Sequence, residues 1–230
     1  MKSLHIDDLD IVGFGGIRER ILIMEPTQFS GRVRDDTWPG FLDLTYFAHA
    51  YFKPFGQTGL HYHDNVDIIS VITRGEIHHQ GTLGDGDVIR QGQVLVQSAG
   101  PKSFRHNEIN GADDIQGMIQ IWMRPSEATA KHQQHRVIDL HEEAETEIYG
   151  GQSDFSSATR LSILPLADQT RHFIEPDSLL YLYQGEAAVI DTNGISHSFT
   201  RGQLIRAHQV ALSGTGLCIW VCATESQSVL

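Results

Sequence analysis

Short apolar runs rich in β-branched residues recur through the first half of the chain, and glycine-containing turns separate them. The run over residues 66–72 (VDIISVI) ends before a glycine at position 75, and the turn over residues 82–86 (TLGDG) precedes a second run. Residues 94–96 (VLV) form a third, and residues 116–123 alternate like a strand. Short strands with a turn about every eight to twelve residues are typical of sandwiches and barrels. The pattern predicts an all-β fold.

The second half of the chain repeats the turn pattern of the first at a constant offset, Gly185 lying 110 residues after Gly75. The aligned pairs are Gly75 with Gly185, Glu76 with Glu186, Gly84 with Gly194, Gly92 with Gly202, Gln93 with Gln203 and Asp67 with Asp177. Turn glycines that keep register without a gap indicate an internal repeat. We therefore expect two tandem barrels, over residues 1–125 and 157–230.

Residues 126–156, between the expected barrels, are polar and acidic. They include histidines at 132, 135 and 141 and glutamates at 142, 143, 145 and 147. Because no apolar framework surrounds these side chains, we interpret the segment as a solvated linker. We therefore do not expect His132, His135 or His141 to bind a metal.

Two pairs of polar residues flank the best-defined β region. His61 and His63 are separated by one residue, as are His106 and Glu108. Alternate side chains of a strand share a face, so the members of each pair lie about 6.7 Å apart on one side. If the two strands are neighbours, three imidazoles and a carboxylate meet, and this is a ligand set for a divalent transition metal. The alternative is that each pair is a surface or core feature that binds nothing.

The same offset pairs none of these four residues with a ligand in the second half. Arg171 aligns with His61, Phe173 with His63, Gly216 with His106 and Cys218 with Glu108. The chemistry is therefore expected within residues 61–108. On one strand, Cys218 and Cys222 would lie about 13 Å apart, too far for a disulfide, so we predict two free, buried thiols.

Composition excludes some classes of function. The formal net charge is −12 and the isoelectric point about 5.4, which argues against a nucleic-acid-binding surface. Residues 1–12 contain no apolar signal core, and no apolar run is long enough to span a membrane. We expect a cytoplasmic protein, monomeric or homodimeric, with a small molecule or another protein as its partner.

Several of these motifs resemble those of the cupins, in the form found in the pirin family. The matching segments are residues 59–63 (GLHYH), Asp67, Gly75, residues 98–100 (SAG) and residues 106–110 (HNEIN). Residues 13–20 (GFGGIRER) and 38–41 (WPGF) resemble one pirin subgroup. Pirins usually have proline at the position of Tyr62 and glutamate at that of Asp67, but neither difference removes a ligand.

The resemblance implies a bicupin with one metal site, held by His61, His63, His106 and Glu108. Four protein ligands leave two positions of octahedral Fe(II), Mn(II), Ni(II) or Co(II) open for water, dioxygen or substrate. Tetrahedral zinc would be closed, and affinity alone favours copper or zinc over iron. The ligands therefore do not identify the metal, whereas the family suggests Fe(II).

Three functions compete at this stage. The resemblance implies a quercetin 2,3-dioxygenase-type enzyme acting on a small aromatic substrate, in which Glu108 is either a ligand or the base that takes the substrate's hydroxyl proton. It equally implies a metal- and redox-dependent regulator of transcription factors or metabolic enzymes. In the third, the metal only stabilises the barrel. The aromatic residues of 41–55 and Trp122 are expected in the core or pocket wall, and His79 beside a ligand or at the surface.

Overall fold

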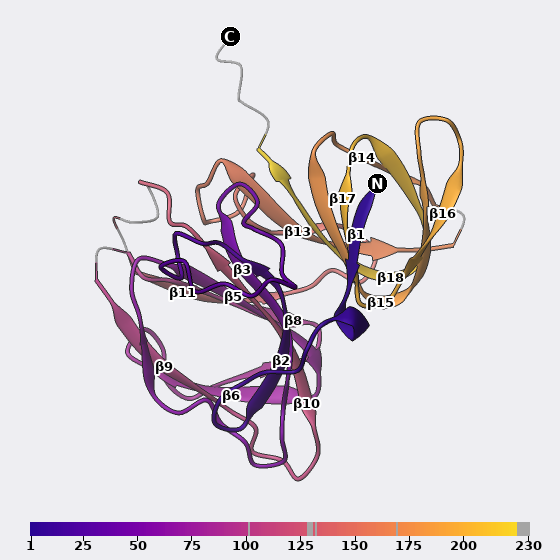
Figure 1. Ribbon diagram of the computed structural model, residues 1–230. Helices are drawn as coiled ribbons and strands as arrows, with labels where there is room; N and C mark the ends of the chain where they lie inside the picture. The colour runs from indigo at the N-terminus through magenta and orange to yellow at the C-terminus, as the bar shows by residue number, and fades with distance from the viewer. Residues whose placement is uncertain (101, 128–130, 132, 169, 225–230) are drawn as a thin grey trace. The chain divides into compact units, whose positions relative to one another are not determined.

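The computed structural model describes residues 1–230 except 101, 128–130, 132, 169 and 225–230, and its regular structure is almost entirely strand (Figure 1). A short 3₁₀ turn, η1 (Ile6–Asp8), lies near the N-terminus, and no helix in the described ranges is long and apolar enough to cross a membrane. The chain forms two compact units, Leu9–Leu140 and a second made of Met1–Asp8 with His141–Leu230. The predicted all-β fold is confirmed.

The unit Leu9–Leu140 is built from two antiparallel sheets. Its strands are β2 (Ile17–Met24), β3 (Leu44–Phe52), β4 (His61–His63), β5 (Asp67–Arg74), β6 (Glu76–Gly81), β7 (Asp87–Arg90), β8 (Gln93–Ser98), β9 (Phe104–Ile109), β10 (Gln116–Met123) and β11 (Gln134–Asp139). The order is β11-β8-β5-β10-β3-β2 in the six-stranded sheet and β4-β9-β6-β7 in the four-stranded sheet.

Apolar side chains from both sheets form a common core in this first barrel. Ile72 and Leu95 of the six-stranded sheet belong to one buried cluster with Ile77 and Ile89 of the four-stranded sheet. Burying each side chain of this size stabilises the fold by about 1.5–3 kcal/mol. Because side chains alternate along each strand, every second side chain points into the space between the two sheets. The predicted site residues point into the same space.

The second unit is a second barrel with a single branched sheet. Its strands are β1 (Lys2–His5), β12 (Thr146–Tyr149), β13 (Thr159–Leu166), β14 (His172–Ile174), β15 (Ser178–Ile190), β16 (Ser196–Thr200), β17 (Gln203–Ala207) and β18 (Val210–Ala223). They follow the order β1-β17-β15-β18-β13-β12, with β14 on β18 and β16 on β15. The long strands β15 and β18 each correspond to two shorter strands of the first barrel.

The expected repeat is visible in the turns. Gly92 (φ +85°) and Gly202 (φ +87°) occupy equivalent left-handed positions, which favour glycine, before β8 and β17. At the short strands, however, the ungapped offset fails. By bridge register, His61 opposite His106 in β4 and β9 corresponds to His172 opposite Leu212 in β14 and β18.

By the same register Ile174, rather than Phe173, corresponds to His63, and Gly214, rather than Cys218, corresponds to Glu108. The residue-by-residue alignment at the ligand positions was therefore wrong by one residue at the first strand and by four at the second. Its conclusion remains, because a single histidine of the set is kept in the second barrel.

The expected domain boundaries need correction. β11 lies within the predicted linker, yet it pairs with β8 through six residues, from Gln134 opposite Ser98 to Asp139 opposite Gln93. β12 also lies there and pairs with β13 of the second barrel. The N-terminal strand β1 pairs with β17, so residues 1–8 complete the second barrel in the way that β11 completes the first. Of the linker histidines, His132 lies outside the described residues.

Both cysteines are free and buried, as predicted. Cys218 is 0% and Cys222 1% exposed. Burial raises the pKa of the Cys218 thiol well above its usual range, and it raises that of Cys222 to about 12. The reactive thiolate is therefore nearly absent at neutral pH.

We expect neither thiol to react with Ellman's reagent in the native protein at pH 8, while both react in denaturant. Burial limits access and keeps the sulfur protonated, so modification requires opening of the second barrel. Absorbance of the released thionitrobenzoate measures the reaction, and the fully denatured protein, with two thiols per chain, is the control. Rapid titration of either cysteine in native conditions would contradict this burial.

Candidate metal centre

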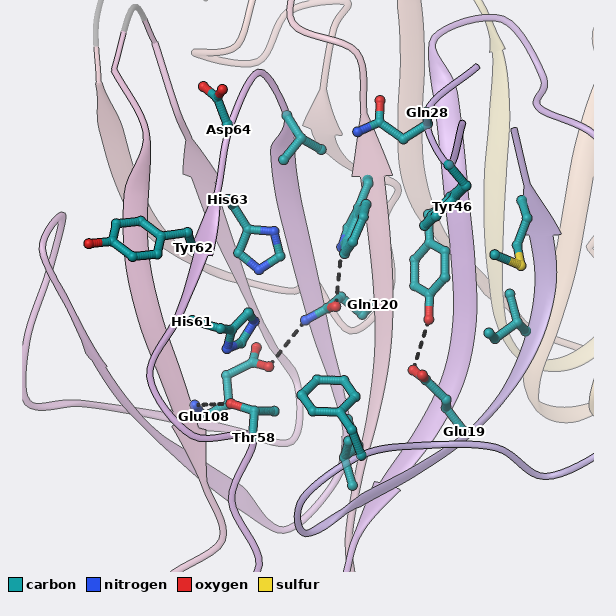
Figure 2. Close-up of a pocket in the computed structure, with 17 residues that line it drawn as sticks. Glu19, Gln28, Tyr46, Thr58, His61, Tyr62, His63, Asp64, Glu108 and Gln120 are labelled. Carbon is teal, nitrogen blue, oxygen red and sulfur yellow. Dashed lines mark hydrogen bonds between the residues drawn. The ribbon is translucent and has the colours of Figure 1, made fainter. Parts of the chain in front are cut away.

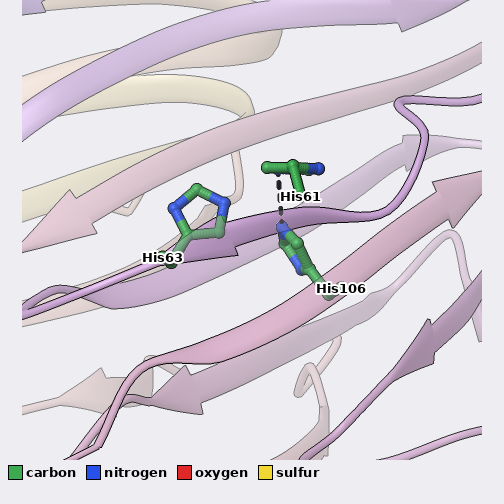
Figure 3. Close-up of side chains that lie close together, drawn as sticks. All are labelled: His61, His63 and His106. Carbon is green, nitrogen blue, oxygen red and sulfur yellow. Dashed lines mark hydrogen bonds between the residues drawn. The ribbon is translucent and has the colours of Figure 1, made fainter.

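Three histidines from two neighbouring strands face one another in the first barrel. β4 pairs with β9 so that His61 lies opposite His106 and His63 opposite Phe104. The ring centroids of the three histidines are each 4.7 Å from the other two, and Figure 3 shows the rings facing a common space. One ligand atom from each lies within 4.8 Å of those of the other two. The spacing in the sequence had predicted this convergence.

The hydrogen bonds orient the rings for metal binding. His61 Nδ1 lies 2.8 Å from the carbonyl oxygen of Gly59, and His106 Nδ1 lies 2.9 Å from Oε1 of Gln97. If each Nδ1 donates to its oxygen, both Nε2 atoms carry lone pairs, and these atoms are only 3.2 Å apart. His63 Nε2 is buried and has no hydrogen-bond partner among the described residues. A cation between these nitrogens would remove the repulsion between the two close lone pairs and would give His63 Nε2 a partner. The residues therefore fit a metal.

Asn107 fixes the segment that leads into β4. Its Oδ1 accepts a hydrogen bond from the Gly59 amide at 2.8 Å, and its Nδ2 donates to Oε1 of Gln57 at 3.0 Å. The Glu108 amide donates to Thr58 Oγ1 at 3.0 Å. The side chain between His106 and Glu108 therefore holds the loop whose carbonyl orients His61.

Tyr62 points away from the centre. It is 66% exposed, and its ring lies under the guanidinium of its register partner Arg105, 4.6 Å from ring centroid to Cζ. This cation–π contact ties β4 to β9 on the outer face and contributes about 0.5–1 kcal/mol at an exposed site. Tyrosine where pirins usually have proline therefore leaves the inward histidines unaltered.

Burial favours the neutral form of two of the three histidines, His63 and His106. It lowers the pKa of His63 to about 3, with the neighbouring His61 adding to the effect. Burial likewise lowers the pKa of His106, and three nearby histidines reinforce the shift. A neutral imidazole is the form that binds metal, so these ligands need not lose protons at neutral pH.

Glu108 lies in the same pocket but does not join the histidine group among the described residues. Ser70 Oγ donates to its Oε1 at 2.9 Å, and Gln120 Nε2 donates to its Oε2 at 3.1 Å. Burial raises the pKa of Glu108 to about 7, and the two hydrogen bonds only partly offset the increase. The carboxyl is therefore poised to gain or lose a proton near neutral pH.

The centre opens into a cavity of about 430 Å³, within the usual range for small-molecule sites. Figure 2 shows Glu108 and His63 in this pocket with Gln120, and the Tyr46 hydroxyl directed at Glu19. Tyr46 lies 4.7 Å from Trp122 by ring centroid, and the Phe29 ring stacks on Trp122 at 5.7 Å. Aromatic surface thus forms one wall.

Most of the other predicted residues can be placed, and some were missed. Trp122 and Tyr46 line the pocket and Phe47 and Phe52 lie in the core, both as expected, whereas Phe55 is 68% exposed. Sequence reasoning did not identify the buried pocket residue Glu19, which accepts a hydrogen bond from Tyr46 at 2.8 Å. Its only signal was its position between Ile17 and Ile21, with which it alternates on the buried face of β2.

His79 and His135 also depart from expectation in part. His79 is 1% exposed, and its ring centroid lies 5.7 Å from that of His106, so it adjoins a candidate ligand rather than the surface. His135 lies on β11, and its Nε2 is 2.7 Å from Oδ2 of Asp87. The interpretation of His135 as a solvated linker residue was therefore wrong, and His141 alone of the described linker histidines is exposed.

Comparison with known proteins gives one family. Residues 32–123 match the family model described as Pirin. The resemblance to the pirin family is confirmed. The chain is 30% identical over 105 residues to a quercetin 2,3-dioxygenase of Escherichia coli, a match covering 44% of this chain and 45% of the relative. It thus spans less than half the length of that relative.

Solved structures share the fold over nearly the whole chain. A bacterial pirin, YhhW of Escherichia coli in complex with nickel(II), has a TM-score of 0.76 at 15% identity, covering 97% of this chain and 99% of that one. A quercetin 2,3-dioxygenase of Acinetobacter baumannii has a TM-score of 0.68 at 15% identity, covering 97% and 86%. At 15% identity these structures establish the fold alone, two tandem cupin barrels. The histidine cluster is a candidate site for a divalent metal.

We expect His61→Ala, His63→Ala and His106→Ala each to remove one equivalent of bound metal. Loss of a residue that only hydrogen-bonds to a ligand lowers metal affinity by roughly 10- to 100-fold, and loss of a ligand itself should lower it further. Metal analysis of protein purified anaerobically measures the change. His78→Ala is the matched control, since His78 is a half-exposed histidine on β6 that faces Glu76. Full metal content in any of the three variants would show that its histidine is not a ligand.

Proposed function

We propose that this protein is a metal-dependent dioxygenase that opens flavonol-like substrates such as quercetin, with Fe(II) held by His61, His63 and His106 and, when its carboxylate turns toward these histidines, by Glu108. The observation that carries the proposal is the convergence of three imidazoles at an aromatic-walled cavity beside a buried carboxyl. The pirin-family match and the name of the 30%-identical relative support the substrate class.

The cavity suits a flat aromatic molecule. Phe29, Tyr46 and Trp122 provide a wall of ring faces and edges, and such surfaces stack on planar substrates. Gln120 lies between this wall and the carboxyl, because its Oε1 accepts from Trp122 Nε1 at 3.1 Å while its Nε2 donates to Glu108. One amide therefore couples the position of the aromatic wall to that of the catalytic carboxyl.

Glu108 is the base in this proposal. When bound, the metal supplies Lewis acidity toward an enolic hydroxyl and an electron path to dioxygen. Glu108 removes the proton of that hydroxyl and later returns it to the product, a role suited to a carboxyl with a pKa of about 7. Ser70 and Gln120 hold its two oxygens so that it presents a defined lone pair to the cavity.

The overall reaction is balanced. The two ring C–C bonds flanking the hydroxyl-bearing carbon break, both atoms of one dioxygen molecule enter the depside product, and that carbon leaves as carbon monoxide. The substrate supplies all the electrons, so no external reductant is consumed. The chain's own residues need only bind a planar molecule, exclude competing water and move one proton.

We expect the anaerobically loaded iron protein to consume dioxygen and release carbon monoxide in equal amounts on adding quercetin. In Glu108→Gln the turnover number should fall by about 10²- to 10⁴-fold, the usual contribution of a general base. An oxygen electrode and a gas-phase assay for carbon monoxide measure the two. Glu76→Gln, which alters a half-exposed carboxylate on the same four-stranded sheet, is the control.

Metal analysis of the Glu108→Gln protein separates two roles. Retained iron with lost turnover assigns Glu108 to proton transfer, whereas loss of both assigns it to the ligand set. Undiminished turnover in this variant would remove Glu108 from the mechanism. Stoichiometric iron without any oxygen uptake by the unaltered protein would overturn the dioxygenase proposal and favour the metal-dependent regulator.

A further inference from the structure

A second cluster of possible metal ligands lies in the first barrel, built from His79, Asp87 and His135. Ligand atoms of the three residues all lie within 4.8 Å of one another. His135 Nε2 and Asp87 Oδ2 are 2.7 Å apart, and the ring centroids of His79 and His135 are separated by 5.1 Å. The cluster shares no residue with the three-histidine centre.

The cluster lies where the two sheets of the barrel end. β7 is one edge of the four-stranded sheet and β11 is one edge of the six-stranded sheet. His79 on β6 pairs in register with Asp87 on β7, while His135 on β11 comes from the opposite sheet. An ion bound by all three residues would therefore link the two sheet edges, which have no backbone ladder between them among the strands that the structure describes.

The histidines of this cluster lack the partners that buried imidazoles normally have. His79 is 1% exposed, yet within the described part of the chain neither of its ring nitrogens has a hydrogen-bond partner, and His135 Nδ1 has none either. The Gln97 amide and the Gly84 backbone face His79 without reaching hydrogen-bonding geometry. Buried polar atoms of native proteins are nearly always satisfied, so these unpaired nitrogens are free to serve as ligands to an ion.

The chemistry of the donors indicates which ligand. An imidazole offers one ring nitrogen to a metal, and neither ring nitrogen of His79 is engaged by another group within the described part of the chain. The Asp87 side chain is 42% exposed and that of His135 14% exposed, which leaves one side of the cluster open to solvent. Two imidazoles, one carboxylate and a solvent-facing position are the donor set of a four-coordinate zinc site.

We propose that His79, Asp87 and His135 form a second metal site, which binds Zn²⁺ or a similar divalent ion with water as the fourth ligand. The site differs from the three-histidine centre because a carboxylate on the solvent side supplies negative charge. Bound metal would close the barrel at the β7 and β11 edges. The proposal is independent of the dioxygenase function, since it concerns the number of ions bound and not turnover.

A hydrogen-bonded relay is the competing explanation. Gln97 Oε1 contacts His106 Nδ1, while Gln97 Nε2 lacks a partner among the described residues and faces His79. A small movement would connect His106 through Gln97 and His79 to His135 and Asp87. Such a relay would influence the first centre without binding an ion, so counting ions distinguishes the two.

The test uses chelator-stripped protein titrated anaerobically with Co²⁺, with bound metal counted by equilibrium dialysis and elemental analysis. We expect two equivalents in the unaltered protein and one in either His61→Ala or His135→Ala. The double variant His61→Ala/His135→Ala should bind none, and His78→Ala should keep two. The visible spectrum of the ion retained in His61→Ala should be that of four-coordinate Co²⁺.

Asp87→Asn provides a variant that preserves size and a hydrogen bond to His135 if His135→Ala fails to fold. It should lower affinity at the second site by at least about 10-fold and leave the first site unchanged. At one fixed concentration, Zn²⁺ should raise the melting temperature of His61→Ala by more than that of His61→Ala/Asp87→Asn. One equivalent in the unaltered protein, or two in His135→Ala, would overturn the proposal and leave the relay.

Discussion

Burying imidazoles and a carboxyl between two apolar sheets is the constraint on which the first barrel depends. An unpaired polar group in such a place costs about 1–3 kcal/mol. The six-stranded sheet supplies hydrogen-bond partners from one polar side chain on each of three adjacent strands. These side chains are Ser70 on β5, Gln97 on β8 and Gln120 on β10. Each interrupts an otherwise apolar run, and each contacts a buried polar residue of β9. The polar positions within these apolar strands are therefore explained by their contacts with the buried polar residues of the facing sheet.

Strand periodicity made part of this centre predictable from the sequence. A period of two places His106 and Glu108 on the inward face of β9, and the same rule applies to the two histidines of β4. The second cluster was not predictable in this way, because it depends on which strands end the two sheets. β11 is mostly half-buried or exposed, so its sequence carries almost no strand signal, and His135 there was mistaken for a linker residue.

The second barrel shows why a repeat detected through glycines misplaces side chains. Turn glycines are fixed by backbone conformation, whereas the lengths of short strands and loops vary between the two copies. Where the first barrel has His63 and His106, the second has Ile174 and Leu212, which belong to its apolar core. His172 remains as a lone equivalent of His61. The same architecture thus holds a polar centre in one copy and a continuous hydrophobic interior in the other.

The placement of β4 has a kinetic consequence. This strand supplies two of the three histidines, yet it is only three residues long, lies at the edge of its sheet and, among the strands that can be described, pairs with β9 alone. Local opening of such an edge requires far less free energy than unfolding of the barrel. The lifetime of a bound ion would then be set by the fraying of three residues, which the exposed Tyr62–Arg105 contact slows, and not by the stability of the fold as a whole.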